Sequence, residues 1–288
     1  MNIREPTDTL QRQQLPQDAG RARHGPHDSM TTQAAAEWLG APVSRPNAEL
    51  RLVCFPHAGG STANYAALAR LMPETIELCP VRLPGRETRL RERPYRRAAP
   101  LVADAARELQ PLFERPFALF GHSLGALLAF ELTHWLREAT GQQPVHLFVS
   151  GRRAPHLPDP EPPLSQLPDG PLVAELRRRY DAIPQLVLET PELLELFLPV
   201  LRADCEIIDT YACADRAPLA VPISAFGGTE DGRVGMNELD AWSRHTTGPF
   251  RARALPGDHF YFQGAEETLA AELEQDLAAI VVATRDVA

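Results

Sequence analysis

The stretch Phe117-Ala-Leu-Phe-Gly121-His122-Ser123-Leu124-Gly125 decides the fold. Its apolar beginning is typical of a buried strand, and Ala126-Leu-Leu-Ala-Phe-Glu-Leu132, which follows at once, is typical of a helix. A G-x-S-x-G pattern between a strand and a helix predicts a strained turn that exposes the serine hydroxyl above the sheet. Small residues flank the serine because such a turn leaves no room for larger side chains. Ser123 is therefore the candidate nucleophile.

On both sides of this stretch, short apolar runs alternate with helical patterns. The runs that predict strands are Leu52 to Phe55, Ile76 to Val81, Phe117 to Phe120, Val145 to Val149 and Ile223 to Phe226. The patterns that predict helices are Leu101 to Phe113, Leu124 to Arg137, Leu239 to His245 and Glu267 to Val282. Because strands that alternate with helices pair in parallel, we predict an α/β fold with a mostly parallel central sheet and helices on both faces.

Two parts of the chain depart from this alternation. Between Ala154 and Pro222 a proline-rich connector precedes two amphipathic patterns, roughly Pro171 to Tyr180 and Pro191 to Tyr211. We expect a helical lid, inserted at about residues 154–221 into one domain that covers residues 48–288. Residues 1–47 are polar and lack periodic hydrophobicity, so we expect a mostly disordered extension with a short turn near 34–39. Translation starts at Met1 or at Met30.

A serine hydroxyl becomes a good nucleophile only when a base takes its proton. In the fold predicted here the order along the chain is serine, acid, histidine, with the acid after the penultimate strand and the histidine after the last one. His259 in Leu255-Pro-Gly-Asp-His-Phe260 is the candidate base, and Asp231 in Gly-Gly-Thr-Glu-Asp231 is the candidate acid. Glu230 and Asp258 are the rivals, but Asp258 follows the wrong strand.

The other histidines near these motifs are predicted to have structural roles. His122 shapes the turn beside the serine, and its side chain points away from that of Ser123 because the two are adjacent. Three more histidines lie in or beside helical or strand patterns: His134, His146 and His245. An oxyanion needs two backbone donors, and we expect them to be the amides of Leu124 and of Ala58 in Phe55-Pro-His-Ala-Gly-Gly-Ser61.

Composition excludes several classes of function. The formal net charge of the 288-residue chain is -9, which disfavours binding to nucleic acid. No apolar run approaches the roughly 18–20 residues that cross a bilayer, and the N-terminus lacks the order of a signal peptide, so we expect a cytoplasmic protein without a membrane partner. The four cysteines are widely spaced, which predicts buried thiols rather than disulfides or a metal site.

Several longer motifs resemble the type II thioesterases of polyketide and nonribosomal peptide biosynthesis, members of the α/β-hydrolase superfamily. These motifs are Cys54-Phe-Pro-His-Ala-Gly-Gly-Ser61, Leu83-Pro-Gly-Arg-Glu87, Arg115-Pro-Phe-Ala-Leu-Phe-Gly-His-Ser-Leu-Gly-Ala-Leu-Leu-Ala-Phe-Glu131, Ser150-Gly-Arg-Arg-Ala-Pro155, Pro191-Glu-Leu-Leu-Glu-Leu196, Leu201-Arg-Ala-Asp204, Phe226-Gly-Gly-Thr-Glu-Asp231 and Pro256-Gly-Asp-His-Phe260. The resemblance spans residues 51 to about 280. It implies an editing enzyme that hydrolyses stalled acyl groups on the phosphopantetheine arm of acyl or peptidyl carrier proteins, with Ser123, Asp231 and His259 at the triad positions.

The sequence contains no cluster of metal ligands, and the triad chemistry needs no cofactor, so we expect neither; the substrate is carried on the phosphopantetheine of the partner. This sequence departs from the family at two places. Its first 29 residues are longer than expected, and Asp181-Ala182 replaces a glycine-rich turn in the lid. A release thioesterase is normally fused to a synthase, so a stand-alone editing enzyme is the better prediction.

Carrier proteins are typically acidic, so the enzyme requires a local basic patch. The stretch from Arg82 to Arg97 has seven arginines against two glutamates. Four residues are candidates for binding substrate or carrier: His57, Arg86, Arg89 and Arg93. An ordinary solvated loop with internal ion pairs is the alternative for this stretch. For the whole chain, the alternatives are a general carboxylesterase and a carrier-binding protein without turnover.

Overall fold

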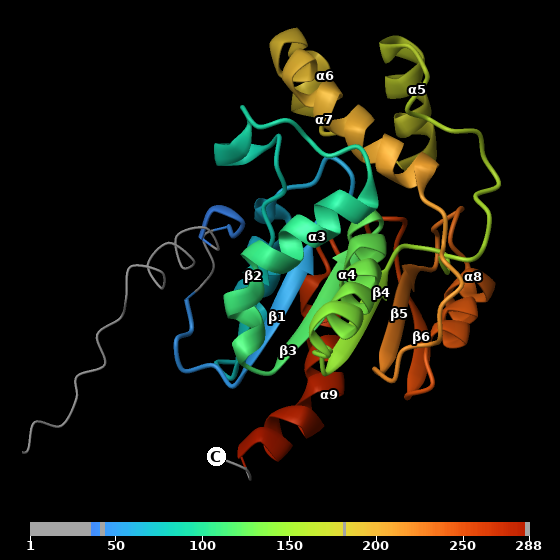
Figure 1. Cartoon of the computed structure of the whole chain (residues 1–288). Helices are drawn as coiled ribbons and strands as arrows, with labels where there is room; N and C mark the ends of the chain where they lie inside the picture. Colours follow the sequence, from blue (N-terminus) through green and yellow to red (C-terminus); the bar gives the residue numbers. More distant parts are fainter. Residues whose placement is uncertain (1–35, 41–43, 181–182, 286–288) are drawn as a thin grey trace, which may run out of the picture.

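Six parallel strands form one sheet, in the order β2-β1-β3-β4-β5-β6 (Figure 1), in the computed structural model, which describes residues 36–40, 44–180 and 183–285. The strands are β1 (Leu50–Phe55), β2 (Ile76–Pro80), β3 (Phe117–His122), β4 (His146–Ser150), β5 (Ile223–Gly228) and β6 (Phe250–Leu255). The predicted α/β class, with a parallel sheet, is confirmed. Because all strands run in one direction, their carboxyl ends share one edge of the sheet.

Helices cover both faces of this sheet. On one face lie α3 (Ala98–Glu108) and α4 (Leu124–Thr140), and on the other lie α2 (Ala66–Leu71) and α9 (Glu266–Arg285) (Figure 1). Successive strand residues point to opposite faces, so Val53 of β1 belongs to the core under α4 while Leu52 belongs to the core under α9. The inner strands β1, β3, β4 and β5 are almost continuously buried, as expected of a sheet that is covered on both sides.

Several regular segments were not among the ranges predicted from the sequence. β6 was missed because all six of its residues are only partly buried, as is usual for an edge strand, so it lacks an apolar run. α2 and the preceding 3-10 turn η1 (Thr62–Tyr65) were missed because both are short. The remaining short elements are η2 (Glu87–Arg89), η3 (Gln110–Glu114), α8 (Met236–Asp240) and η4 (Ala241–His245).

The segment between β4 and β5 that was predicted as a lid, residues 154–221, carries three helices in its described part, above the carboxyl edge of the sheet (Figure 1). They are α5 (Asp169–Tyr180), α6 (Gln185–Glu189) and α7 (Pro191–Thr210). The sequence predicted α5 and α7 but not the short α6. These helices have a small core of their own, in which Leu172 and Leu176 of α5 meet Leu201 and Cys205 of α7. We call residues 154–221 the lid segment.

Part of the extension that was predicted to be mostly disordered packs on the domain. Trp38 is buried, and Leu39 forms an antiparallel bridge with Val81. Residues 1–35 and Asp181-Ala182 lie outside the described residues. Cys54, Cys79 and Cys205 are buried, Cys213 is half-buried, and all four thiols are free. No helix in the described ranges is long and apolar enough to span a membrane.

Candidate active site

Ser123 occupies a strained turn between β3 and α4. Its φ of 54° and ψ of -111° lie in a region that residues with a side chain rarely adopt. A Cβ atom on Gly121 would lie 2.0 Å from the carbonyl oxygen of Gly125, and one on Gly125 would lie 2.1 Å from that of Phe55. The two glycines of the motif are therefore required by backbone contacts. The Ser123 N–H donates to the carbonyl of Ser150 on β4 at 2.8 Å, which ties the turn to the sheet.

The structure brings His259 and Asp231 together from two different loops. Asp231 follows β5 and His259 follows β6, and the Nδ1 of His259 lies 2.8 Å from the Asp231 Oδ2. The Asp231 Oδ1 accepts the backbone N–H of Arg233 at 2.9 Å and that of Val234 at 3.3 Å. Both carboxylate oxygens are thus engaged, and the side chain is 2% exposed. Since a carboxylate can only accept, the His259 Nδ1 carries the hydrogen and its Nε2 is free to take a proton.

The surroundings of Asp231 favour its charged form. Burial raises the pKa of its carboxyl, but the hydrogen bond and the charge interaction with His259, together with the two backbone donors, outweigh burial and lower the pKa below its ordinary 3.8. The two other candidate acids, Glu230 and Asp258, have different surroundings. Glu230 is exposed, and the Asp258 Oδ1 accepts the backbone N–H of Phe260 at 2.7 Å, so Asp258 shapes its own loop.

The remaining histidines named in the sequence analysis make structural contacts. His122 is fully buried, and its Nδ1 lies 2.8 Å from the hydroxyl of Ser150, which also contacts the Tyr261 hydroxyl at 2.6 Å. Burial, with the neighbouring histidines, lowers the pKa of His122 well below its ordinary value. The others are also partnered: His134 with Arg137, His146 with Ser224, and His245 with His156.

The loop His57–Ser61 after β1 lies beside Ser123, since His57, Ala58 and Ser123 line the same cavity. We call this loop the oxyanion loop. Leu124 is the first residue of α4, so its amide has no acceptor within the helix. The His57 Nδ1 lies 2.9 Å from the Ala58 carbonyl, and burial lowers the pKa of His57 to about 4, so this ring is neutral near pH 7. His57 lines the cavity, and its role in binding substrate or carrier stays a prediction.

The arginines that were predicted to bind substrate or carrier have different surroundings. Arg86 is 7% exposed and donates to the Gly60 carbonyl and to Asp204. Arg89 is 9% exposed, pairs with Glu92, and lies with its guanidinium carbon 4.3 Å from the centre of the Trp38 ring. Arg86 and Arg89 are thus buried and paired inside the protein, and their role in binding substrate or carrier stays a prediction. Only Arg93 of the three is exposed, and no ion pair is formed by it among the described residues.

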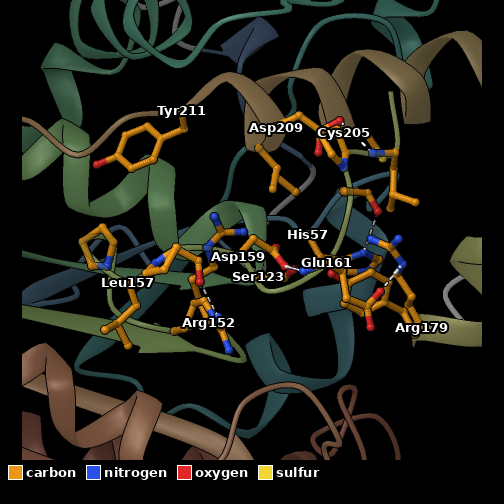
Figure 2. A pocket seen from close by; sticks show the side chains of 18 of the residues that line it. His57, Ser123, Arg152, Leu157, Asp159, Glu161, Arg179, Cys205, Asp209 and Tyr211 are labelled. Carbon is orange, nitrogen blue, oxygen red and sulfur yellow. Dashed lines mark hydrogen bonds and ion pairs between the residues drawn. The ribbon is translucent and has the colours of Figure 1, made fainter. Parts of the chain in front are cut away.

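The cavity next to Ser123 has a volume of about 530 Å³. The oxyanion loop, the loop after β4 and the lid segment form its walls, and Figure 2 shows Cys205, Asp209 and Tyr211 of the lid segment above Ser123 and Arg152. Many of its lining groups are polar or charged: Arg152, Arg153, Asp159, Glu161, Arg179, Tyr180, Asp209, Tyr211 and His259. Such a cavity can enclose a short acyl group and its thioester.

Two residues of this region were not recognised as functional from the sequence. Arg152 faces the cavity, and its Nε is buried without a partner among the described residues. Asp204 on α7 is 1% exposed and contacts the oxyanion loop, 145 residues away in the sequence. Both belong to motifs that were noticed, Ser150-Gly-Arg-Arg-Ala-Pro155 and Leu201-Arg-Ala-Asp204, but a motif alone does not show what its residues contact.

Comparison with known proteins agrees with this geometry. The thioesterase domain family matches residues 50–277. The chain belongs to the thioesterase family. The thioesterase is 41% identical over 214 residues to the gramicidin S biosynthesis protein GrsT of Aneurinibacillus migulanus, and the matched region covers 74% of this chain and 83% of that protein. It is 39% identical over 225 residues to the thioesterase PikA5 of Streptomyces venezuelae, with 78% of this chain and 79% of that protein covered.

A solved structure supports the same assignment. The type II thioesterase BorB from the borrelidin biosynthetic cluster superposes with a TM-score of 0.75 at 35% identity, and the match covers 83% of this chain and 97% of that one. The family predicted from the motifs is therefore confirmed: the thioesterase is of the type II class and has the α/β-hydrolase fold.

Proposed function

We propose that the thioesterase hydrolyses stalled or aberrant acyl groups from the phosphopantetheine arm of a carrier protein of a polyketide or nonribosomal peptide synthase. Ser123 is the nucleophile, His259 the general base, and Asp231 the residue that orients the histidine. One observation carries the proposal: the strained Ser123 turn shares a cavity with His259, and the Nδ1 of that histidine is hydrogen-bonded to Asp231.

Acylation begins when the Ser123 hydroxyl attacks the thioester carbonyl carbon and passes its proton to the His259 Nε2. The carbonyl oxygen becomes an oxyanion, which accepts hydrogen bonds from the amides of Ala58 and Leu124. The tetrahedral intermediate collapses, the C–S bond breaks, and His259 returns the proton to the departing pantetheine sulfur. The acyl group is then an ester of Ser123.

Deacylation repeats these steps with water as the nucleophile. His259 takes a proton from the water, the hydroxide attacks the acyl-enzyme carbonyl, and the same two amides stabilise the second oxyanion. Collapse releases the free carboxylic acid, and the proton returns to the Ser123 oxygen. Asp231 stays ionised and stabilises the imidazolium that forms in both halves, as its lowered pKa favours.

The carrier remains the partner for which the chemistry is best suited. A phosphopantetheine thioester reaches a buried serine on a long, thin arm, and residues of the lid segment line the cavity next to Ser123. Of the basic stretch between Arg82 and Arg97, Arg91 and Arg93 are exposed and have no ion pair within the part of the chain that the structure describes. These two arginines can meet an acidic carrier. The lid segment selects the acyl group through the residues that line the cavity.

Hydrolysis rates for matched substrates test this function. Acetyl-, propionyl- and longer acyl-carrier proteins are compared with the corresponding N-acetylcysteamine thioesters and p-nitrophenyl esters, for the wild type and Ser123→Ala. We expect a higher kcat/KM for carrier-bound short acyl groups and a loss of several orders of magnitude in Ser123→Ala. Equal turnover of simple esters without a carrier preference would indicate a general carboxylesterase, and carrier binding without any turnover would indicate a binding protein.

A further inference from the structure

The oxyanion loop is fixed by contacts from two distant segments. The Gly59 N–H donates to the Asp204 Oδ2 on α7 at 2.8 Å. One guanidinium nitrogen of Arg86 donates to the Gly60 carbonyl at 3.0 Å, and the other donates to the Asp204 Oδ1 at 2.9 Å. Both carboxylate oxygens of Asp204 therefore have a partner, and Asp204 and Arg86 hold two consecutive residues of the loop.

These contacts reach the peptide unit that carries the Ala58 amide. The Gly60 N–H donates to the His57 carbonyl at 2.9 Å, and this carbonyl belongs to the same planar peptide unit as the Ala58 N–H. The next peptide unit has its Gly59 N–H on Asp204 and its Ala58 carbonyl 2.9 Å from the His57 Nδ1. The direction of the Ala58 N–H is thus set by a chain of hydrogen bonds that ends at Asp204 and Arg86.

The backbone of the loop is shaped for this approach. Gly59 has a φ of 71°, and a Cβ atom there would lie 2.6 Å from the Phe197 ring of α7. Only glycine lets the loop pass so close to the helix. The far end of the loop is also held, because Glu87, next to Arg86, accepts the Thr62 N–H at 2.7 Å and the Thr62 hydroxyl at 2.8 Å.

Burying the charged groups of Asp204 and Arg86 costs free energy, so the pair is expected to serve a purpose other than net stability. Asp204 is 1% exposed and Arg86 is 7% exposed, and removing two charges from water offsets much of their attraction. A buried ion pair of this kind adds little net stability but restricts the backbone groups that it contacts to one orientation. Apolar groups of α7 such as Leu201 already form a core against which Ala58 packs, so packing alone did not require a charge here.

We propose that Asp204, held by Arg86, is a positioning residue that aims the Ala58 amide at the oxyanion and so makes the lid helix α7 part of the catalytic geometry. This inference rests on the proposed function, since it takes Ala58 as an oxyanion donor. Asp204 itself touches no reacting atom. Its removal leaves substrate binding intact and weakens only the stabilisation of the tetrahedral intermediate.

The test compares Asp204→Asn and Asp204→Ala with Glu206→Gln. Glu206 lies two residues further along α7 and pairs with the partly exposed Arg96 and Arg97, so its variant removes a charge of the same helix without touching the oxyanion loop. The substrate is the acetyl thioester of N-acetylcysteamine, and butylboronic acid, which forms a tetrahedral adduct with a catalytic serine, is the inhibitor. The readouts are kcat, KM, the inhibition constant Ki of the boronate, and Tm.

Removing an oxyanion donor lowers kcat by about 10²–10³-fold in enzymes of this kind. We expect Asp204→Ala to lower kcat by about 10²-fold and to raise the Ki of the boronate by a similar factor, with KM nearly unchanged. Asp204→Asn, which keeps one acceptor oxygen and nearly the same volume, should lose less, and Glu206→Gln should match the wild type. If Asp204→Ala does not fold, Asp204→Asn decides the question.

Wild-type kcat and boronate affinity in Asp204→Asn, whatever its Tm, would overturn the inference and leave Asp204 a structural residue. The proposed function fails by a different result, namely that the wild type does not hydrolyse thioesters or that Ser123→Ala still does so.

Discussion

Replacing Asp231 with asparagine should invert the hydrogen-bonding role of His259. In the wild type the Oδ1 accepts the backbone N–H of Arg233 and of Val234, and the Oδ2 accepts the His259 Nδ1–H. The asparagine carbonyl oxygen will take the Oδ1 position and accept these two backbone N–H groups. In the flipped orientation the amide NH₂ would face them instead, and each unsatisfied N–H would cost about 1–3 kcal/mol. The amide NH₂ then faces the His259 Nδ1, which must accept, so the proton moves to Nε2.

With its proton on Nε2, His259 cannot take one from Ser123. We expect kcat to fall by about 10³- to 10⁴-fold, or roughly 4–5.5 kcal/mol in the activation free energy. The assay is steady-state hydrolysis of an acyl N-acetylcysteamine thioester near pH 7. Two controls remove a neighbouring carboxylate without changing the tautomer, Glu230→Gln and Asp258→Asn, and each should lower kcat by no more than about threefold. A loss below about tenfold in Asp231→Asn would refute the tautomer argument.

Three further perturbations have outcomes that the structure predicts. Gly125→Ala should lower the free energy of unfolding in urea by about 1–3 kcal/mol or more, because its Cβ would lie 2.1 Å from a carbonyl oxygen of β1. In the control Gly170→Ala the new Cβ meets no atom within 4 Å, so the free energy of unfolding should stay the same or rise. Arg91→Glu with Arg93→Glu should raise KM for an acyl-carrier by about 3- to 10-fold at low salt and leave kcat/KM for the N-acetylcysteamine thioester unchanged; equal effects on both substrates would speak against docking. The depressed pKa of Asp231 contributes stability that is present above its ordinary 3.8 and is lost as the pH falls through the folded-state value. The wild type should therefore exceed Asp231→Asn in stability at pH 7 and lose that advantage progressively as the pH falls below 3.8.

Much of the fold could be predicted because its signals are local. Buried parallel strands such as β1 and β3 are continuous apolar runs, and the Gly121 to Gly125 turn is a local pattern whose steric reason the structure supplies. β6 was not predicted because an edge strand is covered less completely, and this one alternates Arg with Ala instead of forming an apolar run. The short α2 and α6 escaped because a helix of one or two turns shows too little periodicity.

The candidate site likewise has parts that could be predicted from the sequence and parts that could not. The proximity of Ser123, Asp231 and His259 could be predicted because each follows a strand whose carboxyl end faces the same edge of a parallel sheet. The burial of Arg86 and Arg89 could not be predicted, since a run of arginines in sequence does not show which guanidinium groups fold inward onto Asp204 or Trp38. Contacts over such sequence distances depend on packing, which no local pattern records.

The most direct test of the central claim is to map the residue that a fluorophosphonate labels. This reagent bonds covalently to an activated serine oxygen with loss of fluoride, and mass spectrometry of the digested protein locates the adduct. We predict a single adduct on Ser123, absent from Ser123→Ala and prevented by prior incubation with butylboronic acid. An adduct on another serine, such as the buried Ser150, or labelling that persists in Ser123→Ala, would contradict the account.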